Sequence, residues 1–416
     1  MKVLYDFSVW AMSGMLRLTK GGKSKLARLV KGREGVIDQL KTFREGFSGK
    51  IIWFHVASLG EYEQAKPVIA AVKKTYFDSA VLVTFFSPSG YENVIKKAQA
   101  NVDLITYLPF DTKSNVQQFL DIVKPQMIFF VKYDLWANYI LEAKKRKIPL
   151  FLFSASMRKE QVYFQSYGGF FREVLNSFDH IFTQNQYTLS LLRKIGIEQV
   201  SIAGDTRFDN VQAISESPKK FPELEGFVKG TPVIVIGSAW QEDMELIIPF
   251  INKYSQYKYI IAPHDIDEKV VDKWSKAINK SSIKYSKIDE AGQGEQAVLF
   301  IDNVGMLSSL YQFAHIAYVG GAFGKGLHNI LEPLAFRVPV IFGKLRKVSK
   351  FPEAVISQGA GCGFEVEDAA SFEKILVDLE AVNAYKKAVE SADVLVMENL
   401  GSAQKIIDGV KKSFNE

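Results

Sequence analysis

Residues 51–61 read IIWFHVASLGE, a mostly apolar run that ends in a small segment with a glycine and a carboxylate. Such a run, bounded by turn residues, is typical of a strand buried on both faces of a sheet, and we expect this strand at 51–56. Similar runs follow at intervals that leave room for helices. We expect further strands at 80–84, 127–131, 149–154, 180–183 and 200–203, with helical periodicity at 68–74 and 116–123. This alternation predicts an α/β domain with a parallel sheet.

The alternation returns in the second half of the chain. Residues 212–231 are rich in Ser, Pro, Lys and Gly, as in connections between domains. Beyond them we expect strands at 232–237, 259–262, 297–301, 316–319 and 339–342. Two Rossmann-like domains facing a cleft follow, with ligands at the carboxyl ends of the strands. The predicted boundaries are a first domain at 36–211, a linker at 212–231, a second domain at 232–395 and a C-terminal helix at 396–416.

Positive charge gathers at the start of the chain. Residues 1–50 hold eleven Lys or Arg against four Asp or Glu, although the whole chain carries only +6. An apolar, aromatic stretch at 1–18 precedes most of these cations: Lys20, Lys23, Lys25, Arg28, Lys31 and Arg33. The stretch is short and contains Asp6 and Arg17, so we expect residues 1–35 to form an anchor on an anionic membrane surface, with the protein on the cytoplasmic side. The alternative is an ordinary helix packed on the first domain.

The composition argues against several other kinds of site. Cys362 is the only cysteine, so no internal disulfide can form. The five histidines lack the spacing of a metal cluster, and we expect no bound metal. A nucleic-acid partner is also disfavoured, because the positive charge lies at one end of the chain.

Glu61 follows the first predicted strand in the segment Ser58-Leu59-Gly60-Glu61. A glycine at a strand end allows a tight turn that leaves the carboxylate facing the cleft, where it can act as a general base. The alternative is a glutamate that caps the positive end of a helix. The spacing alone does not separate these two roles.

A glycine-rich loop follows the predicted strand at 316–319. Residues 320–333 read GGAFGKGLHNILEP, in which four glycines would let backbone amides approach an anion, and Asn329 with Glu332 resembles a capping box. We interpret the loop as a phosphate or nucleotide site, although it matches neither a Walker loop nor a dinucleotide fingerprint. A structural loop is the alternative. Segments 237–240, 263–264 and 303–306 also follow predicted strands of this domain. Lys132 and Arg207 are cations at strand ends of the first domain.

These segments, in this order, resemble the Kdo transferases (glycosyltransferase family 30), which add 3-deoxy-D-manno-octulosonic acid (Kdo) to a lipid A precursor. The resemblance runs from about Tyr5 to the end of the second domain. Residues 58–61 match the family's Ser-x-Gly-Glu, and 87–90 its Thr-Pro-Thr-Gly. Residues 108–111, 319–321 and 328–333 are similar to its Leu-Pro-Tyr/Phe-Asp, Val-Gly-Gly and His-Asn-x-Leu-Glu-Pro. Each motif alone is weak, but the ordered set is specific.

The resemblance implies a glycosyltransferase-B architecture and inverting transfer of Kdo from CMP-Kdo to a lipid A precursor (lipid IVA) at the inner membrane. It implies Glu61 as the general base and Arg207 as a stabiliser of the leaving group. It further implies no cofactor and no metal, because cationic side chains can stabilise a single phosphate. The residues that it assigns to the cytidine nucleotide are Pro263, His264, Val304, Gly305, Met306, Asn329, Ile330, Leu331 and Glu332.

Two departures from the family pattern keep other readings open. The family's Glu-x-Glu-Leu-Trp-Pro stands here as residues 132–137, KYDLWA, so that Lys132 replaces a carboxylate. His264 stands where an arginine is common. A transferase that uses a UDP-sugar and a catalytically inactive lipid-binding protein are therefore the alternatives. Release of UDP instead of CMP would identify the UDP-sugar transferase, and lipid binding without turnover would identify the inactive protein.

Overall fold

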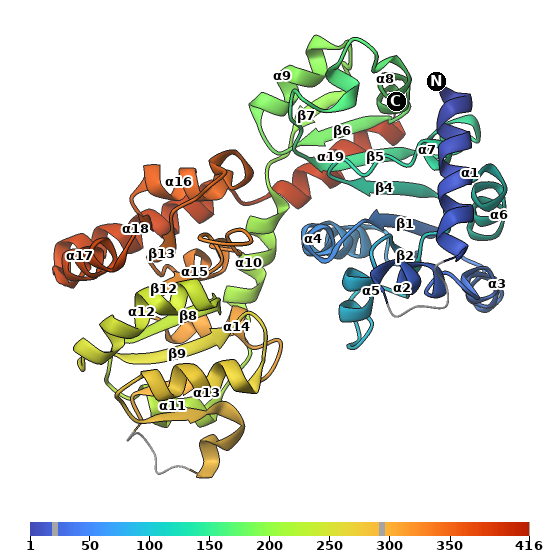
Figure 1. The fold of residues 1–416 in the computed structure, drawn as a ribbon. Coiled ribbons are helices and arrows are strands. Elements are labelled where there is room, and N and C mark those ends of the chain that lie inside the picture. Colours follow the sequence, from blue (N-terminus) through green and yellow to red (C-terminus); the bar gives the residue numbers. More distant parts are fainter. Residues whose placement is uncertain (19–23, 291–295, 416) are drawn as a thin grey trace. The chain divides into compact units, whose positions relative to one another are not determined.

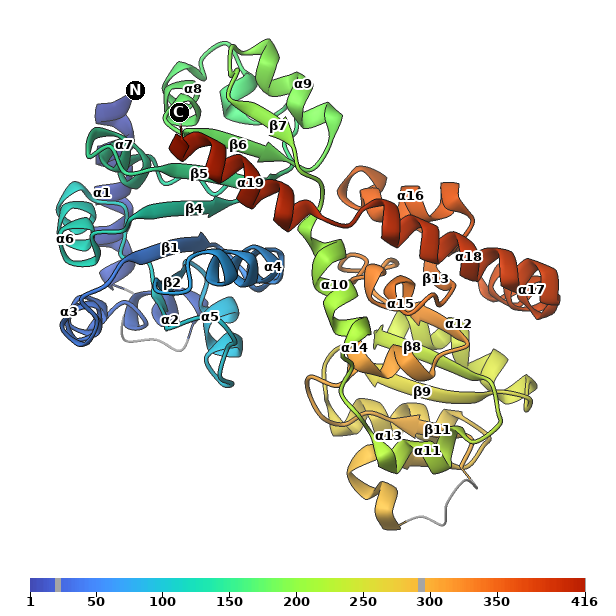
Figure 2. The same cartoon turned by 180° about the vertical axis from the view of Figure 1, so that it is seen from behind.

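The computed structural model describes residues 1–18, 24–290 and 296–415, and it contains two compact units (Figures 1 and 2). The first unit comprises Met1–Asn210 with Leu400–Glu416, and the second comprises Val211–Asn399. Lys20 and Lys23, two cations of the expected anchor, lie outside the described residues. The expected α/β class, with two parallel-sheet domains, is confirmed.

The first unit is built on seven parallel strands in the order β3-β2-β1-β4-β5-β6-β7. The central β1 pairs with β2 and β4, so that His55 lies opposite both Thr84 and Phe130. The strands are β1 (Ile51–Val56), β2 (Ala80–Phe85), β3 (Leu104–Tyr107), β4 (Met127–Val131), β5 (Leu150–Ala155), β6 (His180–Thr183) and β7 (Val200–Ile202).

Helices cover both faces of this sheet (Figure 2). One face packs against α3 (Val36–Gly46), α6 (Lys113–Val123), α7 (Ala137–Lys145), α8 (Gly169–Asn176) and α9 (Gln186–Lys194). The other face packs against α4 (Leu59–Thr75), α5 (Pro88–Val94) and the C-terminal α19 (Ser402–Asn415). The last helix of the chain therefore completes the core of the first unit, through Ala403, Ile406, Ile407 and Val410.

Helix α1 (Lys2–Leu18) has one face packed on the first unit and one face exposed. Tyr5 contacts Phe170 and Phe171, and Val9 and Ser13 are buried, which gives the inward stripe the four-residue spacing of a helix face. The exposed apolar side chains are Val3, Leu4, Phe7, Trp10 and Met15. No helix among the described residues is long and apolar enough to cross a membrane. The expected alternative of a helix packed on the domain thus describes the inward face, and the membrane anchor stays a prediction.

The second unit has seven parallel strands in the order β10-β11-β9-β8-β12-β13-β14. They are β8 (Val233–Ala239), β9 (Lys258–Pro263), β10 (Ser282–Lys284), β11 (Val298–Phe300), β12 (Ile316–Val319), β13 (Val340–Gly343) and β14 (Gly363–Val366). Its helices are α11 (Pro222–Val228), α12 (Gln241–Lys253), α13 (Glu268–Ala277), α14 (Leu307–Leu310), α15 (Leu331–Ala335), α16 (Pro352–Ala360), α17 (Ala369–Glu380) and α18 (Val382–Glu398).

Two further helices lie near the predicted boundaries. Helix α10 (Thr206–Glu216) continues across the division between the units, so the segment expected as a linker is helical at α10 and α11. Helix α2 (Lys25–Lys31) follows α1 within the expected anchor and begins at the cap residue Ser24, whose hydroxyl accepts from the amide of Ala27.

Candidate functional site

Glu61 lies in the first turn of α4, directly beyond the carboxyl end of β1. Its Oε2 accepts the backbone amide of Ala57 at 2.5 Å, and the amide of Ser58 also bonds to the carboxyl group. The residue is only 7% exposed. Glu61 therefore accepts hydrogen bonds at the start of α4, as expected of a capping glutamate. Its side chain is more enclosed than one that faces an open cleft.

The surroundings of Glu61 make its carboxyl group hard to ionise. Burial, followed by the negative charge of Asp134, raises the pKa of Glu61 to about 7. Two effects oppose this rise: the hydrogen bonds from the backbone amides and the positive charge of Lys132. A carboxyl group that titrates near neutral pH is matched to proton transfer at that pH. Capping therefore does not exclude the role of a general base.

A chain of buried polar groups adjoins Glu61 and was not expected from the sequence. Trp53 Nε1 donates to Thr84 Oγ1 at 2.7 Å, and Thr84 Oγ1 lies 3.0 Å from His55 Nδ1. His55 Nε2 lies 2.9 Å from Asp134 Oδ2, which also accepts from Trp136 Nε1 at 2.9 Å. His55 is fully buried. The signal in the sequence is a histidine inside an apolar strand, because a buried imidazole needs partners for both nitrogens.

The two predicted cations of the first unit are held at strand ends. Lys132 follows β4 with a φ of 61°, and its amide donates to Phe153 O at 2.9 Å. A positive φ is costly for lysine, and such residues gather at functional sites. Arg207, in the first turn of α10, donates from Nε and Nη2 to Asp205 Oδ2 at 2.9 and 2.7 Å. Asp205 therefore neutralises part of the charge that the sequence assigned to a donor.

Two of the quoted motifs have structural roles. Gly90, in α5, packs against the start of α4, because a Cβ there would lie 2.9 Å from the amide nitrogen of Leu59. Asp111 is buried and accepts the amides of Asn138 and Tyr139, at the start of α7, at 3.0 Å each. It also accepts the Tyr5 hydroxyl at 2.6 Å, which ties α1 to the first turn of α7. These motifs position the segments that carry Glu61 and Asp134.

The predicted nucleotide residues of the second unit follow three strands of one sheet. Pro263 ends β9 and is followed by His264, residues 304–306 follow β11, and residues 329–332 follow β12. With β8 between β9 and β12, these four strands are neighbours, and their carboxyl ends meet at one edge because the sheet is parallel. Met306, Ile330 and Leu331 are buried, whereas Val304 is exposed. Asn329 Nδ2 donates to Glu332 Oε1 at 3.2 Å.

An aromatic stack forms at this edge. The Trp240 and His264 rings stack with centroids 4.2 Å apart, and His264 lies 4.5 Å from His328. Lys325 Nζ lies 4.4 Å from the centroid of Trp240 on its face, a cation–π contact. Burial, followed by the charge of His264, lowers the pKa of His328 to about 4, so His328 is neutral at pH 7. The sequence placed these residues in neighbouring loops but did not predict that they stack.

The glycine loop is organised differently from the predicted anion cradle. The amides of Gly324 and Gly326 donate to Gly321 O at 3.1 and 2.9 Å, and the amide of Gly321 donates to Asp243 Oδ2 at 3.0 Å. The amides of Gly320 and His328 also donate to backbone oxygens. The glycines thus serve tight packing, as in the structural alternative, and these amides are not presented to a phosphate. The predicted capping box is formed only in part: Asn329 Oδ1 accepts the amide of Leu331 at 3.2 Å, although α15 begins at Leu331 with Ile330 as its cap residue.

No group of three or more His, Cys, Asp or Glu side chains is placed to hold a metal ion in the described part of the chain. The absence of a metal requirement stays a prediction.

Residues 28–210 match the family model described as 3-deoxy-D-manno-octulosonic-acid transferase (kdotransferase). The first unit is therefore similar to a Kdo transferase domain. Two curated proteins named 3-deoxy-D-manno-octulosonic acid transferase support this beyond the domain. That of Aquifex aeolicus is 27% identical over 82% of this chain and 89% of its own length. That of Chlamydophila psittaci is 26% identical over 80% and 78%. The predicted resemblance to the Kdo transferases is confirmed, and the protein is an enzyme of the glycosyltransferase class.

One relative is a longer protein, of which this chain matches only a part. The bifunctional glycosyltransferase/methyltransferase of Fusobacterium nucleatum is 27% identical over 79% of this chain, and the match spans 52% of its length. The chain thus corresponds to about half of that protein.

Solved structures share the fold. UDP-GlcNAc 2-epimerase from Neisseria meningitidis, bound to UDP-GlcNAc, aligns with a TM-score of 0.62 at 17% identity over 87% of this chain and 99% of its own. A glycosyltransferase from Rickettsia africae aligns with a TM-score of 0.54 at 12% identity over 88% and 99%. At these identities the likeness shows the fold alone, which is that of glycosyltransferase-B proteins.

Proposed function

We propose that this protein is an inverting transferase that moves Kdo from CMP-Kdo to a lipid A precursor at the cytoplasmic face of the inner membrane. The observation that carries the proposal is the position of Glu61, beyond β1 of a Kdo transferase domain, with its pKa raised to about 7. Relatives that match most of the chain are named as transferases of 3-deoxy-D-manno-octulosonic acid, which supports Kdo as the sugar that is moved.

In this reaction the carboxylate of Glu61 takes the proton from an acceptor hydroxyl. The hydroxyl oxygen forms a bond to the anomeric carbon of Kdo, and the bond from that carbon to the CMP phosphate breaks, leaving its electron pair on the phosphate. Arg207 and Lys132 would stabilise the phosphate as it leaves. Because Glu61 is 7% exposed, the acceptor hydroxyl must reach it through a narrow opening.

The second unit would bind the cytidine nucleotide through side chains at its carboxyl edge. The residues proposed for these contacts are Pro263, His264, Val304, Gly305, Met306, Asn329, Ile330, Leu331 and Glu332. The glycine loop would contribute by holding 328–332 in place, since its amides at 321, 324 and 326 are engaged within the protein.

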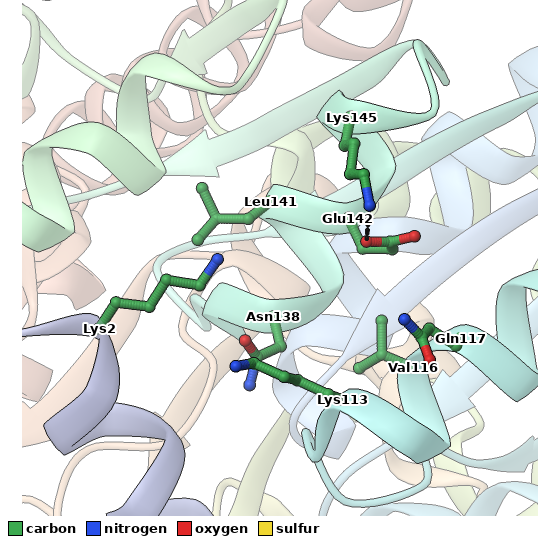
Figure 3. A pocket seen from close by; sticks show the side chains of 8 residues that line it. All are labelled: Lys2, Lys113, Val116, Gln117, Asn138, Leu141, Glu142 and Lys145. Atoms are coloured by element: carbon green, nitrogen blue, oxygen red, sulfur yellow. Dashed lines mark ion pairs between the residues drawn. The ribbon is translucent and has the colours of Figure 1, made fainter.

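The lipid surface is proposed to bind at α1. At the start of this helix lies a cavity of about 210 Å³, whose lining includes Lys2, Lys113 and Lys145 from α1, α6 and α7 (Figure 3). Two of these lysines are paired within the first unit: Lys145 Nζ lies 3.9 Å from Glu142 Oε2, as Figure 3 shows, and Lys113 Nζ lies 2.8 Å from Asp6 Oδ2. Apolar side chains next to clustered cations fit an anionic lipid surface.

We therefore expect Phe7→Glu with Trp10→Glu to reduce binding to vesicles of anionic lipid at least tenfold, because both side chains would leave the acyl boundary and add negative charge. Sedimentation with the vesicles measures the effect. Phe77→Glu, at an exposed phenylalanine outside α1, is the matched control and should bind as the wild type does. Equal loss in both variants would contradict a specific role for α1.

Incubation of the purified protein with CMP-Kdo and lipid IVA, followed by mass spectrometry of the lipid, tests the function. We expect lipid that has gained Kdo, release of CMP, and no loss of turnover with a metal chelator. Turnover with a UDP-sugar alone would replace the donor assignment. No turnover with any donor, together with retained lipid binding, would favour a scaffold protein.

A further inference from the structure

His55 and Asp134 are joined in a way that the proposed reaction does not by itself require. His55 lies near the carboxyl end of β1, inside the first sheet, and is fully buried, so an unused imidazole nitrogen there would be costly. Thr84 Oγ1 accepts from Trp53, and its distance to Phe54 O is long at 3.4 Å. Thr84 Oγ1 also lies 3.0 Å from His55 Nδ1.

This arrangement decides which nitrogen of His55 donates. A carboxylate oxygen can only accept, so His55 donates from Nε2 to Asp134 Oδ2 at 2.9 Å. Trp136 Nε1 then donates to the same oxygen at 2.9 Å, although it also lies 3.1 Å from Nε2. Two donors from rigid rings thus fix one carboxylate oxygen.

Asp134 has reason to move if those donors are lost. Its side chain is 24% exposed, and it belongs to the loop after β4, so an unheld carboxylate would turn toward water. The side chains of His55 and Trp53 point to the same face of the sheet, because the two residues are two apart on β1, and Trp53 packs there with α6 and α7. Glu61 lies on α4, which packs on the other face. Asp134 lies in the loop beyond the carboxyl end of β4, where it accepts a hydrogen bond from His55 and its charge acts on Glu61.

We propose that His55 and Asp134 form a positioning pair, in which His55 fixes the Asp134 carboxylate beside Glu61 so that Glu61 is held ready for proton transfer. The proposal rests on the proposed role of Glu61 as the base. Two charged side chains act on Glu61, and both come from the loop after β4: Asp134 keeps its proton on, and Lys132 favours its loss.

Two substitutions of His55 separate positioning from simple structural support. In His55→Gln the terminal amide nitrogen comes close to the place of Nε2 and can still donate to Asp134. In His55→Asn the shorter amide reaches only toward Thr84. Asp134→Asn removes the charge on a partly exposed loop and is the variant least expected to disturb folding.

The first readout needs no activity. Glu61 keeps its proton to about pH 7 in the folded protein, whereas its ordinary pKa is 4.5. The native state therefore binds the extra proton between these values, and stability falls as pH rises through that window. The melting temperature of the wild type relative to Glu61→Gln should fall from pH 4.5 to pH 7 and level off above it.

The same comparison is made for Asp134→Asn and His55→Asn, each measured relative to the double variant that also carries Glu61→Gln. In both, the pH at which the difference in melting temperature levels off should be lower than in the wild type by about one pH unit. His55→Gln should stay close to the wild type. The acid limb of the kcat/KM profile with CMP-Kdo should move in the same direction in the same variants.

Unchanged midpoints in Asp134→Asn and His55→Asn would overturn the positioning pair, as would equal shifts in His55→Asn and His55→Gln. Shifted melting midpoints in a protein that turns over no donor would support the pair and refute the proposed function. The two failures are thus distinguishable.

Discussion

Glu61→Gln is expected to lower kcat by about a hundredfold or more, the scale of a lost general base. The glutamine keeps an acceptor oxygen for the amides of Ala57 and Ser58, so the first turn of α4 should stay folded. Steady-state kinetics with CMP-Kdo and lipid IVA measure the loss, and the affinity for CMP should not change. Turnover like that of the wild type would leave Glu61 as a helix cap only.

The pH profile adds a second condition to this result. In the wild type, kcat/KM should rise with pH up to about 7 and then level off, because the base works only after it has lost its proton. The residual activity of Glu61→Gln should lack this limb. Glu63→Gln is the matched control, since Glu63 lies on the same helix and is paired with Lys66 at 2.6 Å. It should keep both the rate and the profile.

The central strands could be predicted from the sequence, and the edges were largely missed. Strands β1, β4, β6 and β12 have the predicted bounds, because each is a compact run of mostly apolar residues. The three missed strands, β3, β10 and β14, all lie at sheet edges. Their side chains are partly exposed and their sequences, LITY, SIK and GFEV, are short and mixed, so no buried run marks them.

The candidate site was predictable as a set of loops and not as a set of contacts. Parallel strands bring their carboxyl ends to the same side of a sheet, so Glu61 and Lys132 in the first unit, and separately the loops of the second unit, could be placed from the predicted strand ends. The pairing of His55 with Asp134 depends on side-chain directions across three neighbouring strands, which no local pattern encodes. The role of the glycine loop could not be predicted, because glycine spacing does not say where the amides point.

Gly321→Ala is expected to destabilise the second unit by about 2–4 kcal/mol. Gly321 has a φ of 97°, and an added Cβ would lie 2.4 Å from Gly326 O and 2.9 Å from His328 Cδ2. The backbone atom cannot move without breaking the loop, in which Gly326 donates to Gly321 O. Urea unfolding, followed by the fluorescence of Trp240 and Trp274, measures the change.

Gly324→Ala decides between the two interpretations of the same loop. A Cβ at Gly324 would meet only Glu242, at 3.7 Å, so this substitution should cost well under 1 kcal/mol. If the glycines instead served as an anion cradle, a methyl group at Gly324 would hinder the phosphate and weaken CMP binding while leaving the fold stable. We expect Gly324→Ala to bind CMP as the wild type does in calorimetry. Gly321→Ala should by contrast weaken CMP binding. Asp243 is buried and accepts hydrogen bonds from Tyr318 and from the amides of Gly321 and Trp240, so strain at Gly321 should shift Trp240 and the aromatic stack.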